Sequence, residues 1–491
     1  MDLTVAAEAA GAVCRDTGVK KMKYYLDDKC TLCGWKNLPF AVYDAKNHRV
    51  DFTGKEEFLF LFNCNGKKEI DLSAQSERVR RYVDTLMEKK LLREALDGET
   101  RTLFYNEYPG IFKKSVQWSL TGKCNYRCKH CFQSAPEGVL GEPTKEQLFD
   151  IIRQFCLNGI YAVSLTGGEP LIRRDFFEIV DELLRSNISI ETIYSNGALI
   201  TEDWLTHLAE RDIHPSFQIS FDGIGFHDWM RGVPGAEVRA RDAIRMLNKR
   251  GYAVSAAMTL CRENIGTIRE TVKALAEDGC RSLKLQRAMP QGEWCHQESH
   301  YLSVAETLQA YMDYLPLYLA DGCPLNIQME GFFAYARGRG YSILCDKHMD
   351  EDIVKKLYPC GVVHSSLYVG PNGAVTPCMS MCGAEVESRF PNIFQTPLTE
   401  ILSDSSYTQL TGKKISYILD HVDECRECPY RYRCCGGCRA QATGQSCADY
   451  YGKDPIVCEM FKGGWVDKVT PYAAEIFGED KQMSRPKSDC D

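Results

Sequence analysis

The 491-residue sequence lacks several features that would place it in large classes of proteins. Its longest wholly apolar run covers only residues 58–62, far too short for a membrane-spanning helix. Residues 1–8 lack the basic stretch and apolar core of a secretory signal. No internal repeat or low-complexity tract stands out. We therefore expect a cytoplasmic protein without a membrane partner.

An excess of positive charge is also missing. Lys and Arg number 59 against 67 Asp and Glu, a formal net charge of −8. Because nucleic-acid binding favours a basic face, we expect no nucleic-acid partner. Cysteine, in contrast, is abundant, with 24 residues in a chain too long for a disulfide miniprotein. We expect reduced thiols, some of them cluster ligands, and a chain of this length to hold two to four domains.

Three cysteines lie in one short segment with the spacing C-x₃-C-x₂-C: Cys124, Cys128 and Cys131. Thiolates are soft ligands that suit iron–sulfur clusters or zinc. A cubane cluster usually takes four cysteines, so three from one loop would leave one iron open to another ligand. A zinc knuckle or a chance grouping is the alternative, but the spacings of zinc fingers and ribbons differ from this one.

The spacing resembles the signature of the radical S-adenosylmethionine (SAM) enzymes, in which the open iron binds the amino and carboxylate groups of SAM. The residue before the third cysteine is typically aromatic in that family; here it is His130, with Phe132 following. The resemblance implies a 4Fe–4S cluster on the three cysteines and SAM as cofactor. It also implies a low-potential electron donor, such as flavodoxin or ferredoxin, as a partner.

A second motif, Gly167-Gly168-Glu169-Pro170, follows a short apolar run predicted to be a strand. Glycines at a strand end let the backbone approach a ligand, and Glu169 adds an acceptor. Alone, the motif could be an ordinary turn. With only 35 residues between it and the third cysteine, it resembles the motif with which radical SAM enzymes bind the SAM amino group.

Strands and helices alternate through the middle of the chain. The apolar patterns predict strands at residues 161–166, 191–194, 216–221, 252–260 and 282–286, and helices at residues 145–157, 175–186, 201–211, 237–250 and 264–278. This alternation predicts an α/β fold with a parallel sheet and a ligand site at the carboxyl ends of its strands. By resemblance the fold is the partial (β/α)₆ radical SAM barrel. Ser195 and Ser220 are then candidates for the SAM ribose and carboxylate, although Ser-Asn-Gly and Asp-Gly are also common turns.

A second set of cysteines lies in the C-terminal third: Cys360-x₁₂-Gly373-x₄-Cys378, then Cys425-x₂-Cys428-x₅-Cys434-x₃-Cys438-x₁₉-Cys458. A pair of zinc ribbons is one interpretation. Every spacing also resembles the SPASM domain, which implies two auxiliary 4Fe–4S clusters and thus three clusters in all. The resemblance assigns the distal cluster to Cys425, Cys428, Cys434 and Cys458, and the proximal cluster to Cys360, Cys378 and Cys438.

The sequence pattern does not assign a fourth ligand to the proximal cluster. Cys345, fifteen residues before Cys360, is the candidate; if it is not a ligand, one iron stays open. Cys382, Cys435 and Cys447 fit no position of the pattern and are predicted to be spare thiols.

The first part of the chain precedes both motifs. Predicted strands at residues 38–43 and 48–52 come before predicted helices at residues 58–64 and 76–94, which suggests a winged-helix-like module. It resembles the PqqD-like precursor-recognition element of ribosomal-peptide maturases, which binds a leader peptide as an extra strand beside its third strand and against its last helix. A dimerisation module or a structural cap is the alternative, and Cys30 and Cys33 are predicted to be spare thiols. The expected domains are residues 1–110 for this module, 111–320 for the barrel and 321–475 for the SPASM domain, with a polar tail at 476–491.

Together these resemblances imply a radical SAM peptide maturase that acts on a precursor peptide with a leader sequence. In the family, SAM is cleaved to methionine and a 5′-deoxyadenosyl radical, the radical takes a hydrogen from the substrate, and auxiliary clusters accept the second electron. An oxidative crosslink, with a cysteine thioether as the favoured product, is the expected outcome. No catalytic side chain is assigned beyond the clusters.

Three alternatives stay open. A sulfatase-type formylglycine maturase shares both cluster sets but has an Asp, the presumed base, directly after the G-x₄-C cysteine, where this chain has Met379. Another SPASM oxidoreductase could act on a small substrate or epimerise a peptide. A metal-binding scaffold without enzymatic activity is the alternative from a different class.

Overall fold

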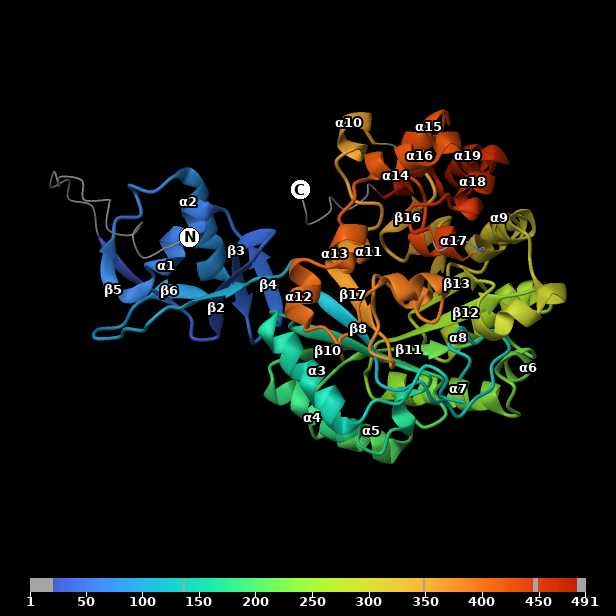
Figure 1. Cartoon of the computed structure of the whole chain (residues 1–491), viewed down its shortest axis with the longest axis horizontal. Helices are drawn as coiled ribbons and strands as arrows, with labels where there is room; N and C mark the ends of the chain where they lie inside the picture. Colours follow the sequence, from blue (N-terminus) through green and yellow to red (C-terminus); the bar gives the residue numbers. More distant parts are fainter. Residues whose placement is uncertain (1–20, 136, 348, 445–448, 484–491) are drawn as a thin grey trace. The chain divides into compact units, whose positions relative to one another are not determined.

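The computed structural model describes residues 21–135, 137–347, 349–444 and 449–483 (Figure 1). The chain divides into two compact units, Met1–Ile111 and Phe112–Asp491, each described by itself below. Within the described residues, no helix combines the length and apolar character that crossing a membrane requires. Cys447 and residues 484–491 of the predicted polar tail lie outside the described residues.

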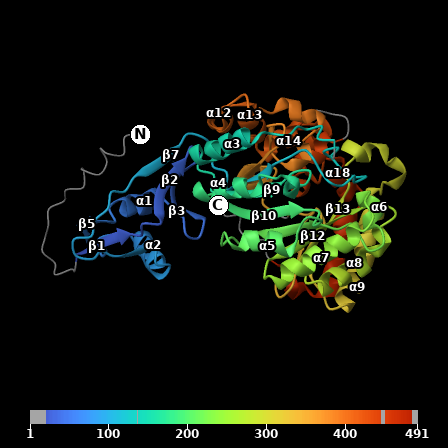
Figure 2. The same cartoon turned by 90° about the horizontal axis from the view of Figure 1, so that it is seen from below.

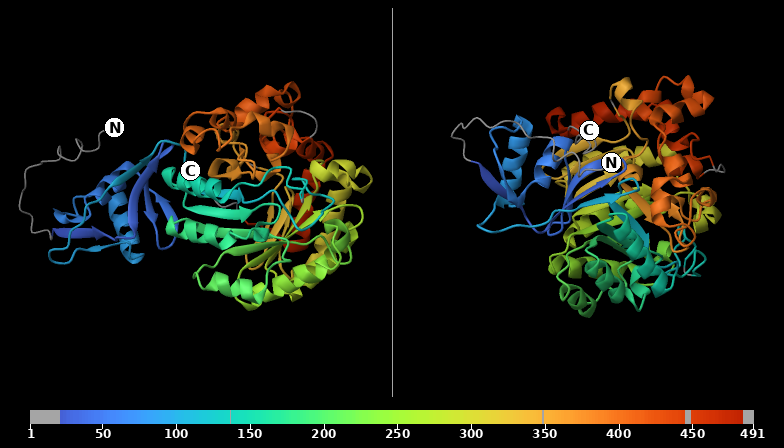
Figure 3. Two further views of the ribbon diagram at one scale, coloured as in Figure 1. Left: turned by 60° about the horizontal axis from the view of Figure 1, so that its bottom comes forward. Right: turned by 60° about the vertical axis from the view of Figure 1, so that its left-hand side comes forward.

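The described residues of the first unit, blue in Figures 1 and 3, form two small sheets and two helices. In one sheet β1 (Met22–Leu26) lies between β5 (Asn65–Ile70) and β6 (Leu92–Glu94), antiparallel to both. The other sheet has the order β4-β3-β2-β7, with β4 (Arg49–Phe52), β3 (Leu38–Asp44), β2 (Cys30–Trp35) and β7 (Tyr105–Tyr108). The helices are α1 (Lys55–Phe62) and α2 (Glu77–Glu88).

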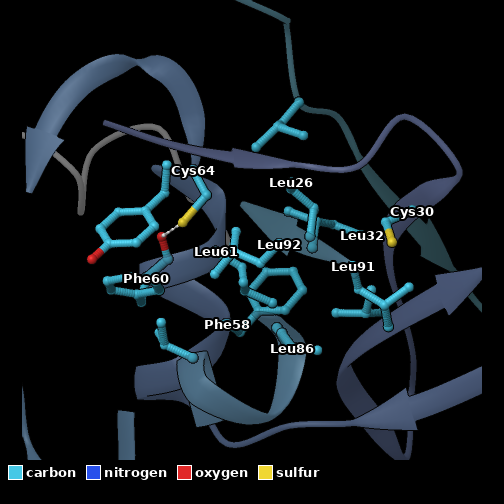
Figure 4. Close-up of a cluster of buried hydrophobic side chains, with 14 of the residues drawn as sticks. Leu26, Cys30, Leu32, Phe58, Phe60, Leu61, Cys64, Leu86, Leu91 and Leu92 are labelled. Atoms are coloured by element: carbon cyan, nitrogen blue, oxygen red, sulfur yellow. Dashed lines mark hydrogen bonds between the residues drawn. The ribbon is translucent and has the colours of Figure 1, made fainter. Parts of the chain in front are cut away.

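The core of this unit forms between the helices and the sheets. Helix α2 begins at Ser76, whose hydroxyl accepts a hydrogen bond from the Val79 amide. Its apolar residues recur at helical spacing, so they share one buried face. Figure 4 shows this core, in which the buried side chains come from α1, α2 and the strands: Phe58, Leu61, Leu86, Leu26 and Leu92.

The prediction of one helix over residues 76–94 was wrong at its C-terminal end. Helix α2 ends at Glu88, and Lys90 has a φ of 57°, outside the helical region. The Leu91 amide then bonds to the Leu86 carbonyl, and Leu92–Glu94 pairs with β1 as a strand. Leu91 and Leu92 continue the helical apolar period, but pairing with β1 provides the backbone with sheet hydrogen bonds instead.

The second unit is built on one eleven-stranded sheet. Seven consecutive strands are parallel: β8 (Ser115–Ser119), β9 (Ala162–Thr166), β10 (Ser189–Ser195), β11 (Ser216–Ser220), β12 (Val254–Leu260), β13 (Ser282–Arg287) and β14 (Asn326–Met329). At one edge β15 (Phe333–Ala336) and β16 (Gly340–Ile343) continue the sheet antiparallel. At the other, β17 (Ser366–Val369) pairs parallel with β8 and is followed by β18 (Val375–Thr376).

Helices connect the parallel strands, which confirms the predicted α/β class. They are α3 (Lys145–Leu157), α4 (Phe176–Arg185), α5 (Glu202–Ala209), α6 (His227–Arg231), α7 (Ala236–Lys249), α8 (Ile268–Glu277) and α9 (Val304–Ala320). Figure 2 shows these helices along the parallel strands β9, β10, β12 and β13. Helix α4 illustrates why they form, because Phe176, Ile179, Val180 and Leu183 are all buried at helical spacing.

Short helices dominate the C-terminal part, orange to red in Figure 1. They are α10 (Glu351–Val354), α11 (Gly361–Ser365), α12 (Leu398–Ser403), α13 (Ser406–Thr411), α14 (Ile415–His421), α15 (Asp423–Arg426), α16 (Arg431–Cys434), α17 (Arg439–Thr443), α18 (Pro455–Lys462) and α19 (Trp465–Phe477). Because β17 joins β8 in the sheet, this part of the chain is built onto the first strand of the parallel series.

Candidate active site

A cavity of about 210 Å³ lies at the carboxyl ends of the parallel strands. Cys124, Cys128 and Cys131 all line it. Residues at the ends of five strands line it as well: Thr166, Ser195, Ser220, Thr259 and Gln286. The structure therefore brings the predicted cysteine loop to the edge of the sheet where parallel folds bind their ligands.

The two glycines of the Gly-Gly-Glu-Pro motif allow this close approach. The amide of Gly168 donates to the Thr121 carbonyl at 2.8 Å, and the Glu169 amide donates to the Lys123 carbonyl at 2.9 Å. A Cβ atom on Gly168 would lie 2.2 Å from the Lys123 carbonyl oxygen, a steric clash. Glycine is thus required where the motif packs against the cysteine loop.

The Glu169 side chain joins two strand ends. Its carboxylate accepts hydrogen bonds from the Asn196 amide at 2.7 Å, the Ser195 hydroxyl at 2.9 Å and the Leu171 amide at 3.2 Å. Burial raises the pKa of Glu169 to about 7. Glu169 and Pro170 are buried, whereas Gly167, Gly168, Ser195 and Ser220 line the cavity. The roles of these residues toward SAM stay predictions.

A buried charged network next to the cysteine loop had no sequence motif to reveal it. Asp222 is fully buried, and its Oδ2 lies 2.7 Å from Arg231 Nε, at an angle outside hydrogen-bond geometry. The same oxygen is 3.2 Å from His130 Nε2, and Oδ1 accepts from the Thr259 amide at 2.9 Å. Burial alone would raise the pKa of Asp222, but the charges of Arg231 and His130 hold it well below its usual range.

Arg231 connects this network to the cysteines. Its guanidinium lies 3.6 Å from the Cys128 sulfur, within hydrogen-bond reach for sulfur. Burial raises the pKa of Cys124 to about 12 and also raises the pKa values of Cys128 and Cys131. The thiols are therefore protonated without metal at neutral pH, and cluster binding must displace their protons.

The donor set fits an iron–sulfur cluster. Cys124, Cys128 and Cys131 are free of disulfides and surround a single cavity. Across the part of the chain that the structure describes, no three His, Cys, Asp or Glu side chains converge closely enough for a single metal ion. Three separated thiols suit the larger cubane, with Arg231 as a neighbouring cation.

Within each of the two predicted groups, the C-terminal cysteines interact electrostatically with one another. Burial, with Cys438 and Cys360 nearby, raises the pKa of Cys378 to about 12. Burial also raises the pKa of Cys438 to about 11, with Cys360 again acting on it. We call Cys360, Cys378 and Cys438 the proximal group.

The other four cysteines interact with one another in the same way. Burial raises the pKa of Cys434 to about 12, and Cys435, Cys425 and Cys428 add to the shift. Cys425 also acts on Cys458. We call Cys425, Cys428, Cys434 and Cys458 the distal group. Ligation by either group stays a prediction, which this arrangement supports.

Cys345 is buried and lies two residues after the end of β16. The adjacent Asp346 forms an ion pair with Arg433 at 2.7 Å, next to Cys434 in the chain. The role of Cys345 as a ligand stays a prediction. Cys382 and Cys435 are both buried.

The proximal group adjoins the cavity. Met379, directly after Cys378, lines the cavity together with the three cysteines of the first loop. The Gln291 side chain further ties this segment to the barrel by donating to the Cys382 carbonyl at 2.6 Å. Cysteine spacing alone does not indicate that Met379 contributes to the cavity wall.

Comparison with known proteins agrees with this arrangement. Residues 118–275 match the Radical SAM superfamily, and residues 360–429 match the SPASM iron-sulfur cluster-binding domain. The chain is a radical SAM enzyme with a SPASM domain. The matched domains confirm the expected cofactors, namely SAM with its 4Fe–4S cluster and auxiliary iron–sulfur clusters.

The similar proteins differ in their names. AdoMet-dependent heme synthase of Nitratidesulfovibrio vulgaris is 26% identical over 356 residues, which is 70% of this chain and 91% of that protein. Mycofactocin maturase MftC of Mycobacterium tuberculosis is 32% identical over 180 residues, 36% of this chain and 45% of that protein.

Two solved structures share the fold. SuiB of Streptococcus suis bound to its precursor peptide SuiA aligns with a TM-score of 0.61 at 15% identity, over 88% of this chain and 99% of that chain. The enzyme anSMEcpe with bound AdoMet and Cp18Cys peptide aligns with a TM-score of 0.54 at 17% identity, over 74% and 98%.

Proposed function

We propose that this enzyme modifies a ribosomally made precursor peptide and installs an oxidative crosslink, with a cysteine thioether as the favoured product. The observation that carries the proposal is the position of Met379, which follows Cys378 of the proximal group and lines the same cavity as the three cysteines of the first loop. When bound, SAM and its cluster supply radical chemistry in the cavity, and the auxiliary clusters supply an electron acceptor. A two-electron oxidation of a substrate needs both functions close together.

Apart from the Arg231 guanidinium, His130 and the three cysteines, uncharged side chains line the cavity. Gln286 donates to the Thr259 hydroxyl at 3.3 Å, which fixes two polar side chains at adjacent strand ends. None of the described residues that line the cavity is a carboxylate or a lysine. In particular, Met379 occupies the position at which a formylglycine maturase has its presumed base. This weighs against the sulfatase-type alternative.

Mass spectrometry of a reacted peptide tests this proposal. The reconstituted enzyme would be incubated anaerobically with SAM, dithionite and a synthetic cysteine-bearing candidate precursor peptide. We expect a product lighter by two hydrogens, with its cysteine no longer alkylated by iodoacetamide. A lighter product whose cysteine is still alkylated would point to a carbon–carbon or carbon–oxygen bond. No change in mass, with porphyrin precursors converted instead, would refute the proposal.

We also infer that the first unit recognises the leader peptide, as its PqqD-like pattern suggests. Residues 112–491 are 380 of 491 residues, or 77% of the chain. The alignment with SuiB covers 88% of the chain, so it must extend into the first unit. The likeness in fold to a protein solved with its precursor peptide supports a recognition role for this unit.

Among the described residues, one edge of strand β4 has no partner strand, which suits strand addition. It is the edge strand of its sheet, and α2 lies beside it, because Lys89 after α2 pairs with Asp51 at 3.5 Å. The Thr53 amide donates to the Phe40 carbonyl of β3. Since backbone groups alternate along an antiparallel strand, those of Val50 and Phe52 face the open edge. Phe52 on β4 and Met87 on α2 are large apolar side chains that remain exposed.

A proline at the open edge tests this site. Val50→Pro removes an outward amide that an added strand would use, at a position where an edge strand tolerates proline. We expect binding of a fluorescent full-length precursor to weaken at least tenfold, while SAM cleavage without peptide is unchanged. The matched control Val50→Thr keeps both the amide and the branched shape, and should bind normally. Equal binding by both variants would rule out strand addition at β4.

A further inference from the structure

Buried tyrosines with unused hydroxyl groups lie near the proximal cysteine group. Tyr407 and Tyr450 are 0% and 1% exposed, and neither hydroxyl has a hydrogen-bond partner among the described residues. Both tyrosines interact electrostatically with Cys378, and Tyr450 also interacts with Cys360. A buried hydroxyl without a partner is unfavourable, so each of these two points to an acceptor that binds there.

A buried lysine lies next to the same group. Lys113 is 1% exposed, and its ammonium donates to the carbonyls of Val363 at 2.7 Å and His364 at 3.2 Å. These carbonyls belong to α11, the helix that starts directly after Cys360. The ammonium also lies 5.1 Å from the centre of the Tyr407 ring.

Burial lowers the pKa of Lys113 to about 7, and the nearby Cys360 thiol acts against this shift. Among the residues that the structure describes, no Asp or Glu forms an ion pair with Lys113. A buried charge without a counter-charge is costly. An iron–sulfur cluster with its thiolates is negatively charged and would supply that counter-charge.

A buried arginine interacts electrostatically with both cysteine groups. Arg439 is 1% exposed and donates to the carbonyls of Tyr450 at 3.2 Å and Gly452 at 2.8 Å, while its Nε has no partner among the described residues. It interacts with Cys438 of the proximal group, with Cys425 of the distal group and with the Asp454 carboxylate. Unlike Lys113, it therefore has a carboxylate nearby.

We propose that Lys113, Tyr407 and Tyr450 tune the proximal cluster to accept an electron. Hydrogen bonds to cluster sulfurs and nearby positive charge both raise the reduction potential of such a cluster. The two phenols can donate the hydrogen bonds, and the ammonium supplies the charge. Because a cluster becomes more negative on reduction, each of these interactions is stronger in the reduced state.

This inference rests on the proposed function only for the source of the electron. In forming a thioether, the peptide loses one hydrogen atom to the SAM-derived radical, then a proton from the cysteine thiol and one electron. The proximal cluster takes up that electron and is reduced in a one-electron step. In the experiment below, dithionite supplies the electron instead, so no peptide is needed.

The test is a redox titration of the reconstituted full-length enzyme, followed by electron paramagnetic resonance. The three cysteines of the C-x₃-C-x₂-C loop are changed to alanine in every sample, so that only the auxiliary clusters give a signal. On this background Tyr407→Phe and Tyr450→Phe each remove one hydroxyl, and Lys113→Met removes the charge. Tyr314→Phe is the matched control, because its hydroxyl is also buried without a partner but its neighbours are Asp321 and Cys323.

We expect the equilibrium constant for reducing one auxiliary cluster to fall about tenfold in each variant, which is a shift of about −59 mV for a one-electron couple. The reduction potential of the second auxiliary cluster, and both potentials of the Tyr314→Phe control, should be unchanged, and every variant should hold its full iron content. Unchanged potentials in both phenylalanine variants would overturn the proposal. If Lys113→Met loses iron, the reduction potentials of the two phenylalanine variants, which preserve the shape of the side chain, decide whether the proposal holds. Since no peptide takes part, failure here is separate from failure to find a crosslinked product.

Discussion

Replacing Arg231 with methionine should strongly destabilise the second unit. The change removes the cation that lies 2.7 Å from Asp222, a carboxylate with no exposure to solvent. A buried carboxylate that loses its partner keeps the cost of desolvation without the compensating attraction. Methionine has a similar length and is apolar, so the change isolates the charge better than alanine would.

The structure sets the size of the effect. Breaking a buried ion pair costs about 3–5 kcal/mol. Asp222 retains the Thr259 amide at 2.9 Å and the His130 ring at 3.2 Å, which places the expected loss near the lower end, at about 3 kcal/mol. In contrast, Arg241→Met removes an arginine from Asp278, which keeps Arg245 at 2.7 Å, so this matched control should lose under about 1 kcal/mol.

Urea unfolding of the metal-free protein, followed by tryptophan fluorescence, measures the difference. The midpoint should fall for Arg231→Met at an unchanged dependence on urea concentration. The double variant Asp222→Asn with Arg231→Met removes both charges and should recover most of the loss. A loss below about 1 kcal/mol for Arg231→Met would refute the claim that this pair is a buried charge network.

The loss should also depend on pH. In the native protein the pKa of Asp222 lies below its unfolded value, so the stability it contributes is present above about pH 4 and is lost as the pH falls further. In Arg231→Met, burial acts on the carboxyl without the guanidinium, and its pKa rises above the unfolded value. Protonation of Asp222 then removes the uncompensated buried charge of the variant. The difference in the free energy of unfolding between the native protein and Arg231→Met should therefore shrink as the pH is lowered from about 8 to about 5.

Three further predictions concern the clusters. Changing all three cysteines of the C-x₃-C-x₂-C loop to alanine should lower iron from about twelve to about eight atoms per chain and abolish 5′-deoxyadenosine formation; 5′-deoxyadenosine production by this variant would contradict the assignment. Cys438→Ala and Cys458→Ala should each lose one auxiliary cluster and still form 5′-deoxyadenosine with little crosslinked peptide; full crosslinking by both, measured by mass spectrometry, would show that the auxiliary clusters are structural. Cys345→Ala should match the iron loss and activity of Cys378→Ala if Cys345 is a ligand, and stay near the native protein if one proximal iron is open.

Much of the chemistry could be predicted from sequence because it depends on local spacing. Three thiols within eight residues must lie in one loop, and Gly168 can pack against that loop because it has no side chain. The βα alternation was equally local, and the predicted helices of the barrel lie close to the observed ones. Apolar periodicity reports which face of an element is buried, and this information is contained in neighbouring residues.

Prediction from the sequence was less accurate where two local structures fit the same apolar pattern. Leu91 and Leu92 fit a helical period, yet Leu92 begins a strand that pairs with β1. Strands β8 and β17, which are five and four residues long, were not predicted. Short strands of this kind are stabilised by their partners in the sheet, and those partners are distant in the chain.

Tertiary structure alone decided which distant residues share the site. The parallel pairing of β17 with β8 brings the C-terminal part of the chain onto the barrel, and with it Met379 into the cavity wall. The contact of Lys113 with the carbonyls of α11 spans about 250 residues of sequence. No local pattern encodes such contacts, because they form only when the whole sheet is assembled. The cysteine spacing therefore predicts which clusters the protein holds, whereas the fold determines which buried charges and hydroxyls surround them.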